Sequence, residues 1–75
     1  MQSEHTLESC QGTVERITFH SEQSGFCVLR VKVKGMRDLV TITGSAASVH
    51  SGEFIEADGN WTNDKTYGQQ FKASN

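Results

Sequence analysis

Apolar and basic residues alternate without interruption in the middle of this chain. The alternating sets are Leu29, Val31 and Val33 against Arg30, Lys32 and Lys34. Side chains two residues apart point to the same face of a β-strand, so one face of this segment can line a core while the other presents cations to solvent. The pattern predicts a strand from Phe26 to Lys34 that belongs to a small binding barrel.

Four other segments show the same period of two and are separated by polar or glycine-containing turns. These segments are 10–20, 39–44, 53–63 and 69–73. In the first segment Val14 occupies an even position, whereas Ile17 and Phe19 occupy odd positions. All three are nevertheless expected to face the core. One inserted residue, a β-bulge near Glu15 and Arg16, reconciles the two sets. A long, bent first strand can pair with two neighbours, which closing a small barrel requires.

Matching the core faces also predicts how neighbouring strands pair. The expected pairs are Val33 with Val40 and Val31 with Ile42 in one hairpin, and Trp61 with Phe71 and Gly59 with Ala73 in the last. The last hairpin sets a large pair beside a small one, as the tapering interior of a barrel prefers. The expected core consists of Val14, Ile17, Leu29, Val31, Ile42, Ile55, Trp61 and Phe71.

The order of these segments predicts the fold class. Residues 45–50 are the only segment with helical potential, and they are long enough for about one turn. Three strands, a short helical turn and two further strands predict an all-β, five-stranded Greek-key OB-fold barrel, with an SH3-like barrel as the alternative. We expect residues 1–9 to be a flexible lead-in and residues 10–75 to form a single domain, excised from a longer protein.

Composition restricts the class of protein further. A chain of 75 residues with 35% hydrophobic content supports one small domain. Its apolar runs are too short to span a bilayer and its N-terminus lacks the features of a signal peptide, so we expect a cytoplasmic protein without a membrane partner. In that compartment Cys10 and Cys27 are expected to be reduced, with Cys27 in the core. No metal site is expected, because the histidines are isolated from one another and from the cysteines: His5, His20 and His50.

The distribution of charge matters more than its sum. The formal net charge of −2 argues against binding nucleic acid by bulk electrostatics, but a local basic stripe can still neutralise a few phosphates. In OB-folds the middle strands and the adjacent loops form the oligonucleotide groove. The polar candidates on that surface are Arg30, Lys32, Lys34, Thr41, Thr43 and Lys65. Phe26 and Tyr67 are the candidate stacking platforms for bases. The alternative interpretation of Arg30, Lys32 and Lys34 is a solvated strand face whose cations discourage aggregation.

Catalytic motifs are missing from the sequence. No Gly-Lys pair occurs, so there is no phosphate-binding loop of the Gly-x-x-x-x-Gly-Lys-Ser/Thr type. Glu56 and Asp58 share an outward parity, but two surface carboxylates on a strand are usually only solvated. We expect no enzymatic activity and no cofactor in this chain.

Several stretches together resemble a known family. They are Gly12-Thr-Val-Glu-Arg-Ile-Thr-Phe-His, Gly25-Phe-Cys-Val-Leu-Arg-Val, Val40-Thr-Ile-Thr-Gly44, Gly52-Glu-Phe-Ile-Glu-Ala-Asp-Gly59-Asn-Trp61 and Tyr67-Gly-Gln-Gln-Phe-Lys-Ala73. From Gly12 to Ala73 the chain resembles the N-terminal OB domain of the RecD-like ATP-dependent DNA helicases, stand-alone relatives of the exodeoxyribonuclease V alpha subunit.

The resemblance implies a parent protein that uses ATP and Mg²⁺ to move 5′ to 3′ on single-stranded DNA during recombination and repair, with its motor motifs beyond Asn75. For the module itself it leaves two functions open. One is weak, sequence-tolerant binding of single-stranded DNA. The other is a structural role without DNA contact, in which the module docks a protein partner or the remaining domains of the parent.

Overall fold

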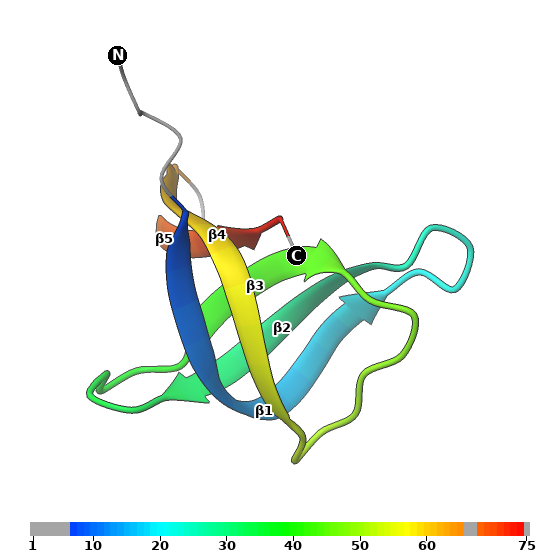
Figure 1. The fold of residues 1–75 in the computed structure, drawn as a ribbon, viewed down its shortest axis with the longest axis horizontal. Coiled ribbons are helices and arrows are strands. Elements are labelled where there is room, and N and C mark those ends of the chain that lie inside the picture. Colours follow the sequence, from blue (N-terminus) through cyan, green and yellow to red (C-terminus); the bar gives the residue numbers. More distant parts are fainter. Residues whose placement is uncertain (1–6, 66–67, 75) are drawn as a thin grey trace.

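A computed structural model describes residues 7–65 and 68–74 of the chain (Figure 1). These residues form five strands and no helix. The strands are β1 (Glu8–His20), β2 (Phe26–Val33), β3 (Val40–Ser45), β4 (Phe54–Asp64) and β5 (Gly68–Ala73). The all-β class and the number of strands are therefore as predicted, although β1 begins at Glu8 rather than at Cys10.

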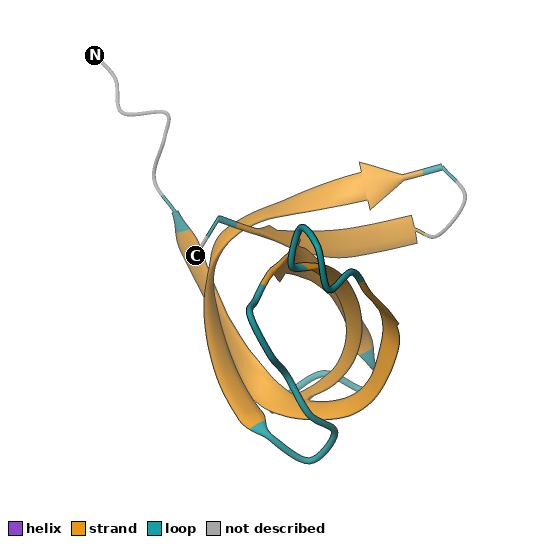
Figure 2. Ribbon diagram, turned by 90° about the vertical axis from the view of Figure 1, so that its right-hand side faces the viewer, coloured by secondary structure: helices purple, strands orange, loops and turns teal. Residues whose placement is uncertain are grey.

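The strands close into a barrel in the order β1-β2-β3-β5-β4, which is visible as a ring in Figure 2. Adjacent strands are antiparallel except for β3 and β5, which run parallel. The long β1 pairs with β4 from Glu8 to Thr13 and with β2 from Gly12 to His20, so one strand serves two neighbours as expected. This architecture is consistent with an OB-fold.

Two irregularities bend β1. The register against β2 shifts between Val14 and Arg16, which confirms the predicted bulge. A second shift between Ile17 and Phe19 was not predicted. It turns the ring of Phe19 to the outside, where 52% of the residue is exposed, so the expected core orientation of Phe19 was wrong. A bulge inserts one residue and reverses the parity of everything beyond it.

The two hairpins differ in how well their registers were predicted. In β4 and β5, Trp61 pairs with Phe71 and Gly59 with Ala73, as expected. In β2 and β3 the observed pairs are Val31 with Val40 and Leu29 with Ile42, so the prediction was wrong by two residues. The connection between these strands is a wide turn rather than a tight one. A slip of two residues keeps the same side chains inward, which is why the core faces were still correct.

Two glycines allow the strands to approach closely at the corners of the barrel. A Cβ atom added to Gly12 would overlap the backbone carbonyl oxygen of Lys32, and one added to Gly59 would overlap that of Lys72. Gly12 and its neighbour Thr13 are the residues at which β1 pairs with both β2 and β4. Any larger residue at either position would force the backbones apart.

The interior is filled by side chains from all five strands. The buried apolar residues are Cys10, Val14, Cys27, Leu29, Val31, Val40, Ile42, Ala57 and Phe71. Ile17, Ile55 and Trp61, which were expected in the core, are only partly buried and pack against it. Both cysteines are free thiols, and Cys27 lies in the core as predicted.

The short helical turn expected between the third and fourth strands is not formed. The connection instead crosses the mouth of the barrel as irregular chain (Figure 2). Its backbone groups bond to other elements: the amide of Ala46 donates to the carbonyl of Gly25 at 2.8 Å, and that of Gly52 donates to the carbonyl of Val14 at 2.7 Å. These long-range hydrogen bonds replace the local ones that a helical turn would need.

Candidate nucleic-acid interface

One outer surface of the barrel gathers basic residues from strands that are distant in the sequence. Side chains opposite each other on paired strands share a face. The register sets Arg16 of β1 opposite Arg30 of β2, then Arg30 opposite Thr41 of β3, then Thr41 beside Gln70 of β5. These four residues form a continuous row across four strands on the solvent side.

Two neighbouring rows extend this surface. Toward the β1–β2 turn, one row sets Phe19 opposite Val28, Val28 opposite Thr43, and Thr43 beside Lys72. On the other side, Thr13 of β1 faces Lys32 of β2. We call the surface made by the three rows the basic face, after its cations Arg16, Arg30, Lys32 and Lys72.

The cations of the basic face have no acidic partners. None of them forms an ion pair within the part of the chain that the structure describes. Acidic residues lie instead on the outside of β4, where Glu56 faces Gln11 and Asp58 accepts a hydrogen bond of 3.1 Å from the Ser9 hydroxyl. Although the net charge is only −2, the molecule therefore carries two surfaces of opposite sign. Both surfaces come from one closed sheet.

An aromatic pair ends the basic face at the β1–β2 turn. The rings of Phe19 and Phe26 are tilted by 51° with centroids 6.2 Å apart, and the two residues are 52% and 42% exposed. The turn beside them is held by hydrogen bonds. The amide of Gly25 donates to the carbonyl of Ser21 at 2.8 Å, and Gly25 has a φ of 81°, which favours glycine. The pair is thus an ordered apolar surface that bases could stack on.

The structure brings together only some of the residues that the sequence singled out. Arg30, Thr41 and Thr43 line one cavity of about 280 Å³ with Thr18, Val28 and Gln70. Lys32 is exposed on the same face. Phe26 is exposed at the mouth of the first turn, as its parity predicted.

Two other predicted residues lie away from the strands of this face. Lys34 follows the end of β2 in the turn, and exposed Lys65 follows the end of β4. Because β3 and β5 are parallel, the β2–β3 turn and the β4–β5 turn lie at one end of the sheet, opposite the aromatic pair. Tyr67 lies outside the described residues.

Sequence reasoning missed three residues of the basic face. Lys72 belongs to the last strand, and its place beside Thr43 depends on the parallel β3–β5 pairing, which has no local signal. Arg16 was used only to locate the bulge. Phe19 was assigned to the core, although its position just before the turn that Phe26 follows could have suggested an aromatic pair.

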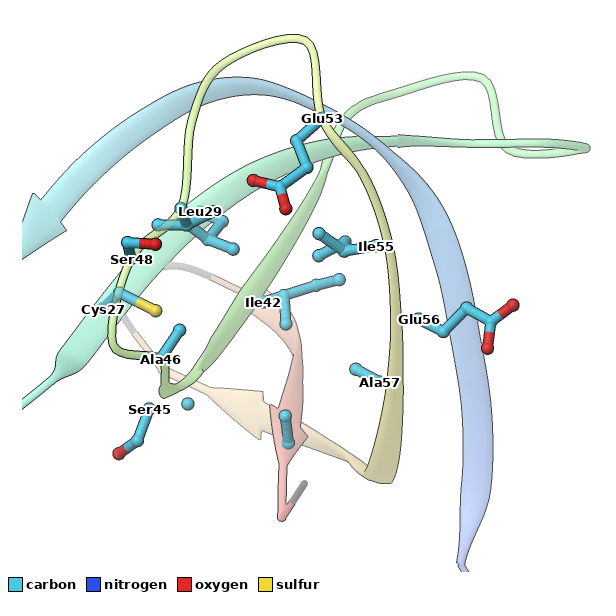
Figure 3. Close-up of a pocket in the computed structure, with 13 residues that line it drawn as sticks. Cys27, Leu29, Ile42, Ser45, Ala46, Ser48, Glu53, Ile55, Glu56 and Ala57 are labelled. Carbon is cyan, nitrogen blue, oxygen red and sulfur yellow. The ribbon is translucent and has the colours of Figure 1, made fainter.

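A second concave site lies at the mouth of the barrel. The β3–β4 connection leaves an apolar pocket of about 150 Å³ above the core. Figure 3 shows Cys27, Leu29, Ile42, Ile55 and Ala57 around it, with the carboxylate of Glu53 overhanging its rim. Burial raises the pKa of the Cys27 thiol, so this sulfur is a weak nucleophile.

Two features are absent from the described residues, a cluster of metal-ligating side chains and a membrane-spanning helix. No group of three or more histidine, cysteine, aspartate or glutamate side chains is close enough together to hold a metal ion within residues 7–65 and 68–74. In the same ranges, no helix has the length and apolar character needed to cross a bilayer.

A closed five-stranded barrel of this topology is consistent with an OB-fold domain. The family model of the OB-fold domain of the ATP-dependent DNA helicase YrrC matches residues 7–75, so the chain belongs to this RecD-like helicase family. No curated protein and no solved structure gave a significant match to the chain.

Proposed function

We propose that this OB domain binds single-stranded DNA along the basic face, weakly and without sequence preference, as an accessory module of a 5′ to 3′ helicase. The observation that carries the proposal is the strand register, which gathers unpaired cations beside an exposed aromatic pair. Cations that contact phosphates release condensed counterions, and aromatic rings stack bases of any sequence. These two interactions give affinity without recognition of the base sequence.

The proposal implies a characteristic dependence on salt. Each phosphate contact on a single strand contributes about −0.7 to the slope of log affinity against log salt. Four cations on the basic face therefore give a slope of about −3 at most. We expect a dissociation constant of about 10⁻⁴–10⁻⁶ M at physiological salt, the range of non-specific binding.

Fluorescence anisotropy with a labelled oligothymidylate tests this function directly. Changing Lys32→Glu together with Lys72→Glu should abolish binding and leave the melting temperature nearly unchanged, because both residues are exposed. Phe26→Ala should weaken binding by about 1–3 kcal/mol without changing the salt slope, because stacking releases no ions. Leu7→Ala is the matched control, since Leu7 is 47% exposed next to Glu8, outside the basic face. Absence of wild-type binding at low salt and high micromolar protein would remove the DNA function.

One observation favours the second candidate function, docking to protein. The apolar pocket under the β3–β4 connection (Figure 3) shares no lining residue with the cavity on the basic face. The remaining domains of the parent helicase are the partner that we would test first. Ser48 is exposed and lines this pocket, so Ser48→Trp should cover it and weaken association with those domains, measured by calorimetric titration. If docking is the function, Lys32→Glu with Lys72→Glu should leave that association unchanged.

The chemistry of the motor is assigned to the rest of the parent. The sequence contains no Gly-Lys pair, so its residues do not fit a phosphate-binding loop for ATP and Mg²⁺. We propose that the parent acts in the cytoplasm in DNA recombination and repair, and that this module keeps the strand close to the motor. No step of ATP hydrolysis is attributed to the module.

A further inference from the structure

The cavity on the basic face is lined by an arginine whose Nε donor is buried and has no partner in the part of the chain that the structure describes. It is lined by Thr18, Val28, Arg30, Thr41, Thr43 and Gln70. The Nε atom of Arg30 is buried and has no hydrogen-bond partner among the described residues. A buried charged donor that lacks an acceptor lowers stability, so such a group is normally paired. The missing partner of Arg30 therefore indicates an acceptor that comes from outside the chain.

A second, independent feature of the same row also favours an anion. Arg16 lies directly opposite Arg30 on the paired strand. Like charges opposite each other in a sheet repel, and no carboxylate of the described residues pairs with either guanidinium. On its other side Arg30 faces Thr41, which is neutral. A negative group bound beside Arg30 would offset this repulsion and offer an acceptor to its guanidinium.

We propose that this cavity is an anchor for one phosphodiester group of a single DNA strand. Arg30 is its principal ligand, because the guanidinium fork matches two phosphate oxygens and a lysine does not. Thr41 and Gln70 also line the cavity, and their hydroxyl and amide groups offer further donors. Arg16 lies opposite Arg30 but does not line the cavity, so it adds positive charge beside the site. The proposal rests on the proposed function and names the point on the basic face where the backbone is held.

The anchor makes Arg30 different in kind from the other cations. Lys32 and Lys72 are exposed and contribute charge, which any cation can replace. Arg30 is only partly exposed, and it contributes the fixed arrangement of its guanidinium donors. The conservative change Arg30→Lys keeps the charge but removes the fork and the Nε donor. It should therefore weaken binding of an oligothymidylate about tenfold, with little change in the salt slope.

The matched control is Arg37→Lys, which makes the same exchange at an exposed residue of the β2–β3 turn, outside the basic face. It should change the affinity less than twofold, because Arg37 does not line the cavity. The melting temperatures of both variants show whether each is folded.

Nuclear magnetic resonance of the arginine side chains of the wild-type chain gives a second readout that needs no variant. Addition of the oligothymidylate should shift the Nε–H signal of Arg30 and slow its exchange with water. The Nε–H signal of Arg37, which is exposed in the β2–β3 turn, should change much less. Inorganic phosphate is added in a separate titration to distinguish a strand from the free ion.

The outcomes separate this inference from the proposed function. Loss of affinity in Arg30→Lys, with a shifted Arg30 signal, supports the anchor. Oligothymidylate binding with an unmoved Arg30 signal and wild-type affinity in Arg30→Lys overturns the anchor and leaves the function standing. Failure of the wild-type chain to bind the strand overturns both. A shift with inorganic phosphate but none with the strand also overturns the anchor, since it identifies an adventitious ion only.

Discussion

Phe71 and Trp61 show how differently two aromatic residues of the same hairpin contribute to the core. Phe71 is fully buried, whereas Trp61 is partly exposed, and their rings meet edge to face with centroids 5.2 Å apart. Truncating a buried aromatic residue removes its own burial and leaves a cavity, whereas a partly exposed one lets solvent and neighbours relax into the space. The larger residue is therefore not the more important one for stability.

Phe71→Ala should lower the free energy of unfolding by about 3–5 kcal/mol, enough to unfold many domains of this size. Trp61→Ala should cost less than Phe71→Ala. Phe54→Ala is the control, and it should change stability by about 0.5 kcal/mol or less because Phe54 is 60% exposed. Urea unfolding followed by circular dichroism measures all three. A Trp61 variant that is less stable than the Phe71 variant would contradict the burial assignment.

The two thiols make the stability depend on alkaline pH. Burial raises the pKa of both Cys10 and Cys27 above the ordinary value of 9.0. The unfolded chain therefore releases these protons at a lower pH than the folded chain does. The free energy of unfolding should be unaffected by the thiols below pH 9.0 and should fall as the pH rises above it.

Unfolding in urea at pH 8 and pH 10 tests this dependence. The wild-type chain should lose more stability between the two values than a variant with Cys10→Ala and Cys27→Ala, which has no thiol to ionise. The variant also accounts for the other groups that titrate in this range. An equal loss in both proteins would show that the thiols do not contribute.

At the scale of elements, closure of the barrel depends on close backbone contact between strands. Gly59 of β4 is paired with Ala73 of β5, and a Cβ added at Gly59 would overlap the backbone of Lys72. Gly35, in contrast, has open space around the position of a Cβ but a φ of 89°. A substitution at Gly59 therefore tests the cost of steric overlap, whereas a substitution at Gly35 tests the cost of backbone strain.

Gly59→Ala should cost more than about 2 kcal/mol, because two paired strands must separate to admit a methyl group. Gly35→Ala should cost about 1 kcal/mol, the strain of a left-handed conformation alone. Thermal melting of the two variants compares them directly. Equal costs would mean that the β4–β5 contact is less tight than the structure shows.

At the scale of the whole molecule, the barrel separates its charges. Cations lie outside β1, β2 and β5, and the carboxylates of Glu56 and Asp58 lie outside β4. The two surfaces meet where β4 pairs with β5, because Lys72 lies opposite Asn60, two residues from Asp58. Screening at physiological salt acts over about 8 Å, so only the carboxylates nearest this boundary act on the basic face under those conditions.

Changing Glu56→Lys together with Asp58→Lys should raise the affinity for an oligothymidylate only slightly at 0.15 M salt, because screening over about 8 Å leaves few cations of the basic face within reach of those positions. At 0.01 M salt, where screening acts over about 30 Å, the same variant should bind more tightly than wild type. Fluorescence anisotropy at the two salt concentrations measures the difference. A large gain at physiological salt would indicate that bulk charge, rather than the basic face, controls binding.

The sequence by itself determined most of the strands and which face of each is buried. The bulge after Val14 and the pairing of Trp61 with Phe71 also followed from it. The physical reason is that inward and outward positions alternate with a period of two, which neighbouring residues express without reference to the rest of the chain. The same local rule identified Arg30 and Phe26 as outward-facing residues.

Only the tertiary structure decided which outward-facing residues lie together. Arg16 meets Arg30 across β1 and β2, and Lys72 joins the same face through the parallel pairing of β3 with β5. The second bulge, which exposes Phe19, and the irregular β3–β4 connection also depend on contacts between distant segments. Pairing between segments far apart in the chain is set by closure of the whole barrel. The alternation of residues within one strand does not determine which distant strand it pairs with.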